Sequence, residues 1–461
     1  MIHARKLPSM FRLKYIASLT FIFALACVCN IGFADDAASA DPGNWPQWRG
    51  PLANGIAPDS NPPLEWSETQ NVKWKVPLPG EGGATPIIWG DKVFVQTAFR
   101  PEKDGSDPKA PSGASIGARA RQRMLAGKPR PYHFVLMAFD RTNGDLLWRR
   151  VAREEYPHEG HHKDNTFASN SPVTDGEYLY AYFGSHGLHA YDFEGYKVWE
   201  RDFGDMQTLL NFGEGSSPAL HGDTIVVNWD HQGRSFIFAI DKKTGKDIWK
   251  KRRDEGTSWA TPLIVEHEGR AQVIVGGTGR TRSYDLKTGE VIWECGGLTK
   301  NVTSTPVLYR GLVYLTSGYG GKRIQAIRLG QKGDLTNSVA IQWSNKRLGS
   351  YVSSPLIYGN NLYFIDANKN IISNFETQLG DAHYTKVRLT NLKGMFASPV
   401  GAADRVYFTG RDGNFAVIEK GPRFELLAQN SLDDHFDASP AIVGDEIYLR
   451  GYKNLYCIAA P

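Results

Sequence analysis

Short apolar runs alternate with polar turn residues along most of the chain, and no long run beyond residue 70 has a helical period. Segments such as FVLMAFD (134–140) and FIFAID (236–241) have the composition of β-strands that end at an Asp. A Gly follows after three further residues, and a second apolar strand then carries a Trp. The pattern therefore predicts an all-β chain built from hairpins.

The Asp–Gly–Trp hairpin occurs several times with nearly constant spacing. The copies are DRTNGDLLW (140–148), DKKTGKDIW (241–249), DLKTGEVIW (285–293) and, one residue shorter, DFEGYKVW (192–199). A catalytic group is seldom needed repeatedly at a fixed interval, whereas a turn is. Asp and Thr can hydrogen-bond the turn backbone, and Gly supplies a positive φ. We therefore interpret the motif as structural, with its Trp as an aromatic anchor.

A second repeated feature is a Ser or Thr followed by Pro and an apolar run, called here the Ser/Thr-Pro marker. The eight markers are Thr85-Pro86, Ser171-Pro172, Ser217-Pro218, Thr261-Pro262, Thr305-Pro306, Ser354-Pro355, Ser398-Pro399 and Ser439-Pro440. A spacing of about 40–45 residues with four short strands per unit is typical of a β-propeller blade. The first gap is about twice the others, which predicts an insertion loop at 100–131.

Eight markers predict an eight-bladed β-propeller of four-stranded antiparallel blades. The last blade ends after LYCIAA (455–460) and lacks an outer, Trp-bearing strand. The strand NVKWKV (71–76) carries Trp74 and precedes the first marker, so we expect it to complete the last blade and close the ring. Blades six and seven have lost the Asp–Gly–Trp motif, and their assignment rests on the marker.

The first 34 residues predict a secretory signal peptide. Arg5, Lys6, Arg12 and Lys14 precede an apolar run, and small residues then stand before two Asp. Residues 35–70 are expected to form an extended strap, and 71–461 the propeller. The chain is therefore predicted to be exported, to the periplasm or outside the cell, with lipid attachment at Cys27 as an alternative.

Composition and charge narrow the class of partner. The chain has a formal net charge of +4, and residues 1–34 hold four basic and no acidic residues, so the remainder is neutral. Neutrality disfavours nucleic acid as a partner. No segment beyond the signal is apolar enough to cross a membrane, and we expect a monomer. Cys295 and Cys457 are predicted on blades far apart in the ring, hence unpaired.

The marker strands and the A-[FIY]-D-x-x-T-G-x-x-x-W turns resemble the pyrroloquinoline quinone (PQQ) repeats of a propeller superfamily. It contains quinoprotein alcohol dehydrogenases and BamB-type assembly lipoproteins. The resemblance covers residues 71–461 and is specific for the fold, while fold and function separate within the superfamily. WPQWRGP (45–51) also resembles the start of exported bacterial proteins with these repeats, and we expect its two Trp to pack on the ring.

The resemblance implies a place for PQQ and Ca²⁺, which can be compared with this chain. The candidate oxygen ligands for Ca²⁺ are Glu214, Asn301 and Asp437, and the candidate ring to lie against the quinone is Trp259. All four residues fall within five positions before a marker. The adjacent Cys-Cys pair of the large dehydrogenases is absent, as is a CxxCH haem motif. We therefore expect no cofactor, with PQQ and Ca²⁺ as the alternative.

Other polar segments could carry chemistry or contact a partner. HEGHHKDN (158–165) places His158, His161 and His162 beside Glu159 in a long loop, so these imidazoles could bind a transition metal. A hydrated or hydrogen-bonded loop is the alternative interpretation. Candidate ligand or partner residues in other loops are Asn165, Asn211, Asp230, His231, Arg280 and Arg282. Ion pairs with carboxylates of a neighbouring blade are the alternative for the two Arg.

Three functional hypotheses follow from the sequence. The favoured one is an exported, non-catalytic binding scaffold that holds a protein or a cell-envelope polymer through its channel-mouth loops. The second is a PQQ- and Ca²⁺-dependent quinoprotein dehydrogenase with a non-standard site. The third is a loop-based hydrolase or lyase that uses a metal at His158, His161 and His162. The unshared loops 100–131, 150–170 and 205–216 are the places to look for function.

Overall fold

The computed structural model describes residues 43–102, 130–366 and 368–461. The chain divides into two compact units, Met1–Asp35 and Asp36–Pro461, and all described residues belong to the second. The predicted signal peptide, Cys27 and most of the insertion at 100–131 lie outside the described residues. Among the residues described, no helix is long and apolar enough to cross a membrane.

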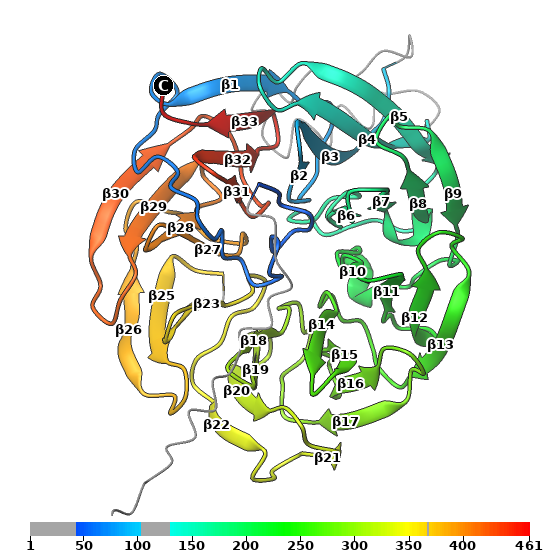
Figure 1. Ribbon diagram of the computed structural model, residues 1–461, viewed down its shortest axis with the longest axis vertical. Helices are drawn as coiled ribbons and strands as arrows, with labels where there is room; N and C mark the ends of the chain where they lie inside the picture. The colour runs from blue at the N-terminus through cyan, green and yellow to red at the C-terminus, as the bar shows by residue number, and fades with distance from the viewer. Residues whose placement is uncertain (1–42, 103–129, 367) are drawn as a thin grey trace, which may run out of the picture. The chain divides into compact units, whose positions relative to one another are not determined.

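In the described residues the strands form eight antiparallel blades around a common axis (Figure 1). The first four are blade one, β2 (Ile87–Trp89), β3 (Lys92–Phe99), β4 (Tyr132–Asp140) and β5 (Leu146–Glu155); blade two, β6 (Val173–Thr174), β7 (Leu179–Tyr182), β8 (Leu188–Tyr191) and β9 (Lys197–Arg201); blade three, β10 (Ala219–His221), β11 (Thr224–Trp229), β12 (Ser235–Asp241) and β13 (Asp247–Arg253); and blade four, β14 (Leu263–His267), β15 (Arg270–Val275), β16 (Thr281–Asp285) and β17 (Val291–Cys295).

The other four blades follow the same inner-to-outer order. They are blade five, β18 (Val307–Tyr309), β19 (Leu312–Ser317), β20 (Arg323–Arg328) and β22 (Ile341–Asn345); blade six, β23 (Leu356–Tyr358), β24 (Asn361–Ile365), β25 (Ile371–Glu376) and β26 (Ala382–Arg388); blade seven, β27 (Val400–Ala402), β28 (Arg405–Thr409), β29 (Asn414–Glu419) and β30 (Leu426–Ser431); and blade eight, β31 (Ala441–Val443), β32 (Glu446–Arg450), β33 (Asn454–Ile458) and β1 (Val72–Pro77). Two 3₁₀ turns, η1 (Gly184–His186) and η2 (Leu209–Asn211), lie in loops.

The predicted ring closure is confirmed. Strand β1 pairs antiparallel with β33 and supplies the outer strand of blade eight, as Figure 1 shows. Trp74 lies opposite Cys457 in this register and is buried. Because the last blade is built from both ends of the propeller, blade eight has its full set of four strands and the ring is closed, which is how propellers limit exposed strand edges.

The repeated Trp anchors join each blade to the next one. Trp249 of β13 donates its indole N–H to the carbonyl of Leu286, 2.8 Å away in the hairpin turn of blade four. Its ring lies against Gly289 of that turn, where φ is +68° and a Cβ would come within 2.6 Å of the indole. Indole-to-carbonyl bonds of this type also start from Trp74, Trp148, Trp199 and Trp343. The motif Gly therefore supplies both the turn conformation and the space for the preceding Trp.

The Ser/Thr-Pro markers form a chain of hydrogen bonds around the axis. The backbone N–H of Ser171 donates to the hydroxyl oxygen of Ser217 at 2.9 Å, and the N–H of Ser217 donates to that of Thr261 at 3.0 Å. The same bond occurs at seven successive steps from Thr85 to Ser439. The sequence marker is thus the point at which neighbouring inner strands are tied together.

The described part of the predicted strap crosses the end of the ring that carries the β2–β3 and β27–β28 turns. Trp45 pairs with Ile88 of blade one, and Ile56 pairs with Gly401 of blade seven. Between them Arg49 is buried in the channel and donates to the carbonyls of Pro355 at 2.8 Å and Pro399 at 3.1 Å. The strap therefore closes the channel on this side with the Trp48–Arg49 segment.

Two local departures from the repeat are visible. Blade six keeps the motif turn, contrary to the sequence interpretation. Glu376 takes the place of the Asp, and Gly380 has φ of +74° and packs against Trp343, so the Gly and the turn are kept while the Asp and the Trp are replaced. In blade five the insertion adds a short strand, β21 (Gly333–Asp334), which pairs parallel with β17 of blade four. Trp293 is accordingly fully buried and donates to Gln272 within its own blade.

Candidate functional site

A cavity of about 370 Å³ occupies the channel between the marker ring and the loops at its mouth. This volume lies near the lower end of the range of about 300–1,000 Å³ that is typical of ligand pockets. Residues that line it are Trp48, Gly83, Thr85, His162, Asp164, Asn165, Ser169, Ser171, Phe212, Glu214, Gly215, Ser217, Trp259, Thr261, Thr303, Thr305, Tyr319, Tyr351, Val352, Asn368, Phe396, Ser398, Asp437 and Ser439. Because the strap contributes Trp48, the cavity is a closed-ended pocket and not an open channel.

The lining combines aromatic rings, hydroxyls and carboxylates. Trp259 and Phe212 lie 6.5 Å apart by ring centroids, and Tyr319 and Tyr351 lie 5.2 Å apart. Seven of the eight Ser or Thr residues of the markers line the cavity. Its carboxylates are Asp164, Glu214 and Asp437, and neither Lys nor Arg is among the described lining residues. The cavity is therefore suited to a neutral or cationic group and poorly suited to an anion.

Two of the three carboxylates are joined by one arginine. Arg411, in the β28–β29 turn, binds both oxygens of Asp437 at 2.6 and 3.0 Å and one oxygen of Asp164 at 3.1 Å. Burial alone would raise the pKa of Asp437, but hydrogen bonds from His435 and Arg411 hold it below the usual range. Asp164 belongs to the long loop after blade one, so this ion pair fastens that loop to blades seven and eight, which precede blade one in the ring.

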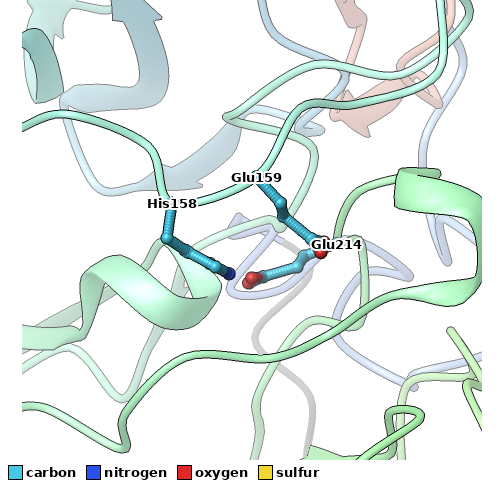
Figure 2. A group of neighbouring side chains, drawn as sticks. All are labelled: His158, Glu159 and Glu214. Carbon is cyan, nitrogen blue, oxygen red and sulfur yellow. The ribbon is translucent and has the colours of Figure 1, made fainter.

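The third carboxylate, Glu214, lies beside His158 and Glu159 (Figure 2). One ligand atom from each of the three residues lies within 4.8 Å of the others. Glu214 accepts hydrogen bonds from the backbone N–H of Ser185 at 2.7 Å and from its hydroxyl at 2.5 Å. Despite these bonds, burial raises the pKa of Glu214 to about 7. Gly184 is required here, because a Cβ at that position would overlap a carboxylate oxygen of Glu214.

The histidines predicted to bind a metal together take different positions. The Nε2 of His158 lies 2.7 Å from the carbonyl oxygen of Met206. His161 packs edge-on against Phe167 with ring centroids 4.5 Å apart, and His162 lines the large cavity. Of the three, only His158 belongs to the described group of candidate metal ligands.

The residues considered for PQQ and Ca²⁺ are brought near one cavity, but the polar atoms of Trp259 and Asp437 are already engaged. Trp259 lines the wall and donates its indole N–H to the carbonyl of Gly213 at 2.7 Å. Asn301 is buried just outside the lining, with φ of +55° and no partner for its Nδ2 among the described residues. Asp437 is paired with Arg411.

The remaining sequence candidates divide into mouth residues and structural ones. Asn165 donates to the carbonyls of Phe212 and Glu214 and so joins the two mouth loops. Asn211 is exposed in η2. Asp230 is buried in a bidentate pair with Arg253, and His231 accepts the N–H of Gln207.

Arg280 and Arg282 are both held by carboxylates, in agreement with the ion-pair alternative. Arg280 pairs with Glu294 of its own blade and with Asp334 of the blade-five insertion. Arg282 pairs with Glu255 at 3.0 Å and with Glu294. Neither lines the cavity.

Sequence reasoning missed Arg411, Asp164, Ser185 and His186. Asp164 stands within the polar segment singled out at 158–165, and its acidity was the available signal. Arg411 lies 247 residues away along the chain from its partner Asp164, and nothing in the sequence pairs them. Ser185 and His186 occupy η1, a turn that interrupts the blade-two repeat.

Comparison with known proteins places these observations in a family context. A family profile described as outer membrane protein assembly factor BamB matches residues 133–386, more than half of the chain. The chain is 23% identical over 332 residues to the BamB assembly factor of Shewanella oneidensis, covering 69% of this chain and 74% of that protein. It is 24% identical over 301 residues to a polyvinylalcohol dehydrogenase of Sphingopyxis sp., covering 51% of this chain and 46% of that protein.

Solved structures share the fold at low identity. BamB from Moraxella catarrhalis superposes with a TM-score of 0.54 at 14% identity, over 80% of this chain and 98% of that one. Quinohemoprotein alcohol dehydrogenase from Comamonas testosteroni superposes with a TM-score of 0.61 at 11% identity, over 92% of this chain and 81% of that one. Both likenesses concern the fold, which a scaffold and a dehydrogenase have in common.

Proposed function

The chain belongs to the family described as outer membrane protein assembly factor BamB, and we propose from this that it is an exported, non-catalytic propeller that binds a protein partner in the cell envelope. The partner would dock on the channel mouth, the face opposite the strap. Export through residues 1–34, and lipid attachment at Cys27 as its alternative, remain predictions from the sequence.

The observation that carries the proposal is an exposed apolar rim beside the aromatic cavity. Leu210 is 74% exposed and has φ of +53°, a left-handed conformation that a branched side chain rarely adopts. Strain of this kind is concentrated at binding and switch regions. Tyr319, also exposed, lies at the cavity edge. Together they offer apolar anchor points next to a pocket that a partner side chain can enter.

The Leu210 part of the rim is also fastened to neighbouring loops, which favours binding to a preformed surface. The η2 loop is tied to the long loop after blade one because Thr208 donates its hydroxyl and its N–H to Glu159. Asn165 adds two further bonds to the same loop, and Arg411 anchors Asp164 from the β28–β29 turn of blade seven. The polar groups of the mouth thus join loops from four blades into one surface.

The experiment is site-specific photo-crosslinking in cells that produce the full chain. A photoreactive amino acid at Leu210 or at Tyr319 should give a discrete adduct with one envelope protein. The matched control is Tyr196, which is 69% exposed in the turn just before outer strand β9, away from the mouth. The probe at Tyr319 is then combined with the substitution Leu210→Asp. Loss of the Tyr319 adduct in this variant would support docking of the partner on the rim. Equal labelling from Tyr196, or none from the rim, would contradict it.

The quinoprotein alternative is favoured by one observation, the convergence of Glu214, Trp259 and Asp437 on one cavity. The residues present do not fit the group well. PQQ carries three carboxylates, while the described lining holds carboxylates and no Lys or Arg, and Asp437 is already neutralised by Arg411. We propose that the cavity does not bind PQQ. A titration with PQQ and Ca²⁺, followed by absorbance and melting temperature, tests this, since saturable binding with a thermal shift would restore the dehydrogenase hypothesis.

A further inference from the structure

A second, smaller cavity lies behind the mouth, between the long loop after blade one and the loop that leads into blade three. Its volume is about 20 Å³, room for a single water molecule or ion. His158, Glu159 and Glu214 border it, and Figure 2 shows the three side chains converging from the two loops. A nitrogen and two carboxylate oxygens therefore meet around a space of ionic size.

The two carboxylates have no basic partner. Glu159 is bound by Thr208, and Glu214 is bound by Ser185; in the described part of the chain neither forms an ion pair with Lys or Arg. Two neighbouring carboxylates in a partly enclosed site repel each other unless a proton or a cation lies between them. The neighbouring hydroxyl and amide donors orient both side chains toward the cavity without neutralising them.

A second, independent observation concerns the burial and hydrogen bonding of His186. This residue is 5% exposed and borders the same small cavity. Its Nδ1 lies 2.9 Å from a carboxylate oxygen of Glu155, while no hydrogen bond is found for its Nε2 among the described residues. A carboxylate bound to one ring nitrogen leaves the other nitrogen with its lone pair, the arrangement of metal-binding imidazoles. His186 and His158 lie 6.1 Å apart by ring centroids.

We propose that His158, Glu159 and Glu214 bind one divalent transition-metal ion of the Zn²⁺ class, with His186 as a further ligand directly or through water. Imidazole nitrogen mixed with carboxylate oxygen suits Zn²⁺ better than Ca²⁺ or Mg²⁺, which prefer oxygen alone. At about 2.0–2.2 Å from zinc, the ligand atoms come closer together than in the structure. The ion then pins the long loop to the η2 loop, and this site does not depend on the proposed protein partner.

The first test is direct metal binding by the full mature chain. Protein dialysed against EDTA is titrated with ZnCl₂ by calorimetry, and Co²⁺ replaces Zn²⁺ for absorption spectroscopy. We expect one ion per chain, a higher melting temperature with zinc, and a Co²⁺ band that changes in His158→Asn. Glu214→Gln and Glu159→Gln should each weaken zinc binding by more than about tenfold, since even residues that only support ligands have effects of about 10–100-fold.

The controls separate this site from the histidine cluster inferred from sequence alone. His161 lies three residues from His158 and is outside the group of candidate ligands. The His161→Asn variant should therefore bind zinc like the parent chain. Melting curves in EDTA show whether each variant is folded before titration. Three results would each overturn the proposal. His161→Asn could lose zinc affinity as much as the ligand variants do, folded Glu159→Gln and Glu214→Gln could bind zinc as the parent does, or the chain could bind Ca²⁺ in preference to Zn²⁺. Failure here would leave the rim-docking proposal untouched, since that is read out by crosslinking.

Discussion

The indole Nε1 of Trp249 donates a hydrogen bond to the carbonyl oxygen of Leu286 in the next blade, across 2.8 Å. Trp249 is the Trp of one Asp–Gly–Trp motif and Leu286 follows the Asp of the next one, and the same pairing of motif positions recurs at other blades of the ring. The side chain of Trp249 is 8% exposed and packs against the Gly of the neighbouring turn. The repeated motif therefore stabilises the interface between blades as well as the hairpin within one.

Replacing Trp249 by Ala should lower the free energy of unfolding by about 3–5 kcal/mol, as large core truncations do. The loss combines buried aromatic area with an unpaired carbonyl at Leu286. Chemical denaturation followed by circular dichroism measures it. Trp249→Phe, which keeps a ring but no donor, should cost less than the Ala variant.

The matching change on the other blade is Gly289→Ala. It should destabilise the protein because φ is +68° and the new Cβ would lie 2.6 Å from the indole ring of Trp249. In the Trp249→Ala background the part of this cost that comes from the indole should disappear, and only the contact with the flexible end of Lys251 and the positive φ remain. Full additivity of the two changes would show that the contact is not the reason for the Gly.

The marker ring predicts a specific effect of removing one hydroxyl. Ser217→Ala leaves the buried N–H of Ser171 without an acceptor and should cost about 1–3 kcal/mol. Ser217→Thr keeps the hydroxyl, and Thr occupies the same position at Thr261. The Thr variant should therefore melt near the parent. If Ala and Thr variants are equally stable, the hydrogen-bond ring does not contribute to stability.

The fold could be predicted from sequence because each of its two repeated motifs consists of residues that a particular local backbone structure needs. The Gly of the hairpin must adopt a positive φ, and the marker must end a loop and begin an inner strand. The same logic identified Trp74 as the anchor of a strand borrowed from the N-terminal side. It failed in blade six, where Glu376 replaces Asp, because a motif search counts residue types while the turn depends on backbone geometry.

The site was predicted less well, for a physical reason. Residues such as Arg411 and Asp164 meet because the ring brings distant loops to one mouth, and no local pattern encodes that approach. Glu214 and His158 were each noticed in the sequence, yet they were assigned to different hypotheses, and only the structure joins them. Of the four residues selected by their position before a marker, Glu214, Trp259 and Asp437 line the cavity, whereas Asn301 is not among its lining residues.

The mouth ion pair predicts a pH-dependent mutational effect. The pKa of Asp437 is held below its usual range, so its contribution to stability is present above the ordinary pKa and is lost as pH falls through the lowered one. Arg411→Met should cost about 3–5 kcal/mol at pH 7, because it leaves a buried carboxylate unpaired. The gap to the parent should narrow below about pH 4, where carboxylates take up protons. Denaturation curves at several pH values measure it.

The control for that prediction is the double variant Arg411→Met with Asp437→Asn. Removing both charges should recover part of the lost stability at pH 7, since Asp437 is then no longer a buried carboxylate without a cation, while Asp164 keeps its ion pair with Lys163. A cost of Arg411→Met that is the same at pH 7 and pH 4 would show that packing on Phe396, and not the charge pair, is what the arginine contributes.

The last prediction concerns the attachment of the strap, which covers the closed end of the cavity. Arg49 donates to three carbonyls, those of Asn54, Pro355 and Pro399, and so links the strap to the inner ends of blades six and seven. Arg49→Ala leaves these buried carbonyls without a donor and should cost about 1–3 kcal/mol for each one that water does not reach. Because the strap then loses its central attachment, limited proteolysis should cut within residues 50–62 faster than in the parent, while the blades stay resistant. Arg405→Ala, which removes bonds to Asn61 and Pro62 at the strap's far end, is the control and should loosen only that end. If Arg49→Ala is cut at the parental rate, the strap is held by Trp45 and its strand-like pairing alone, and the arginine serves only to fill the channel.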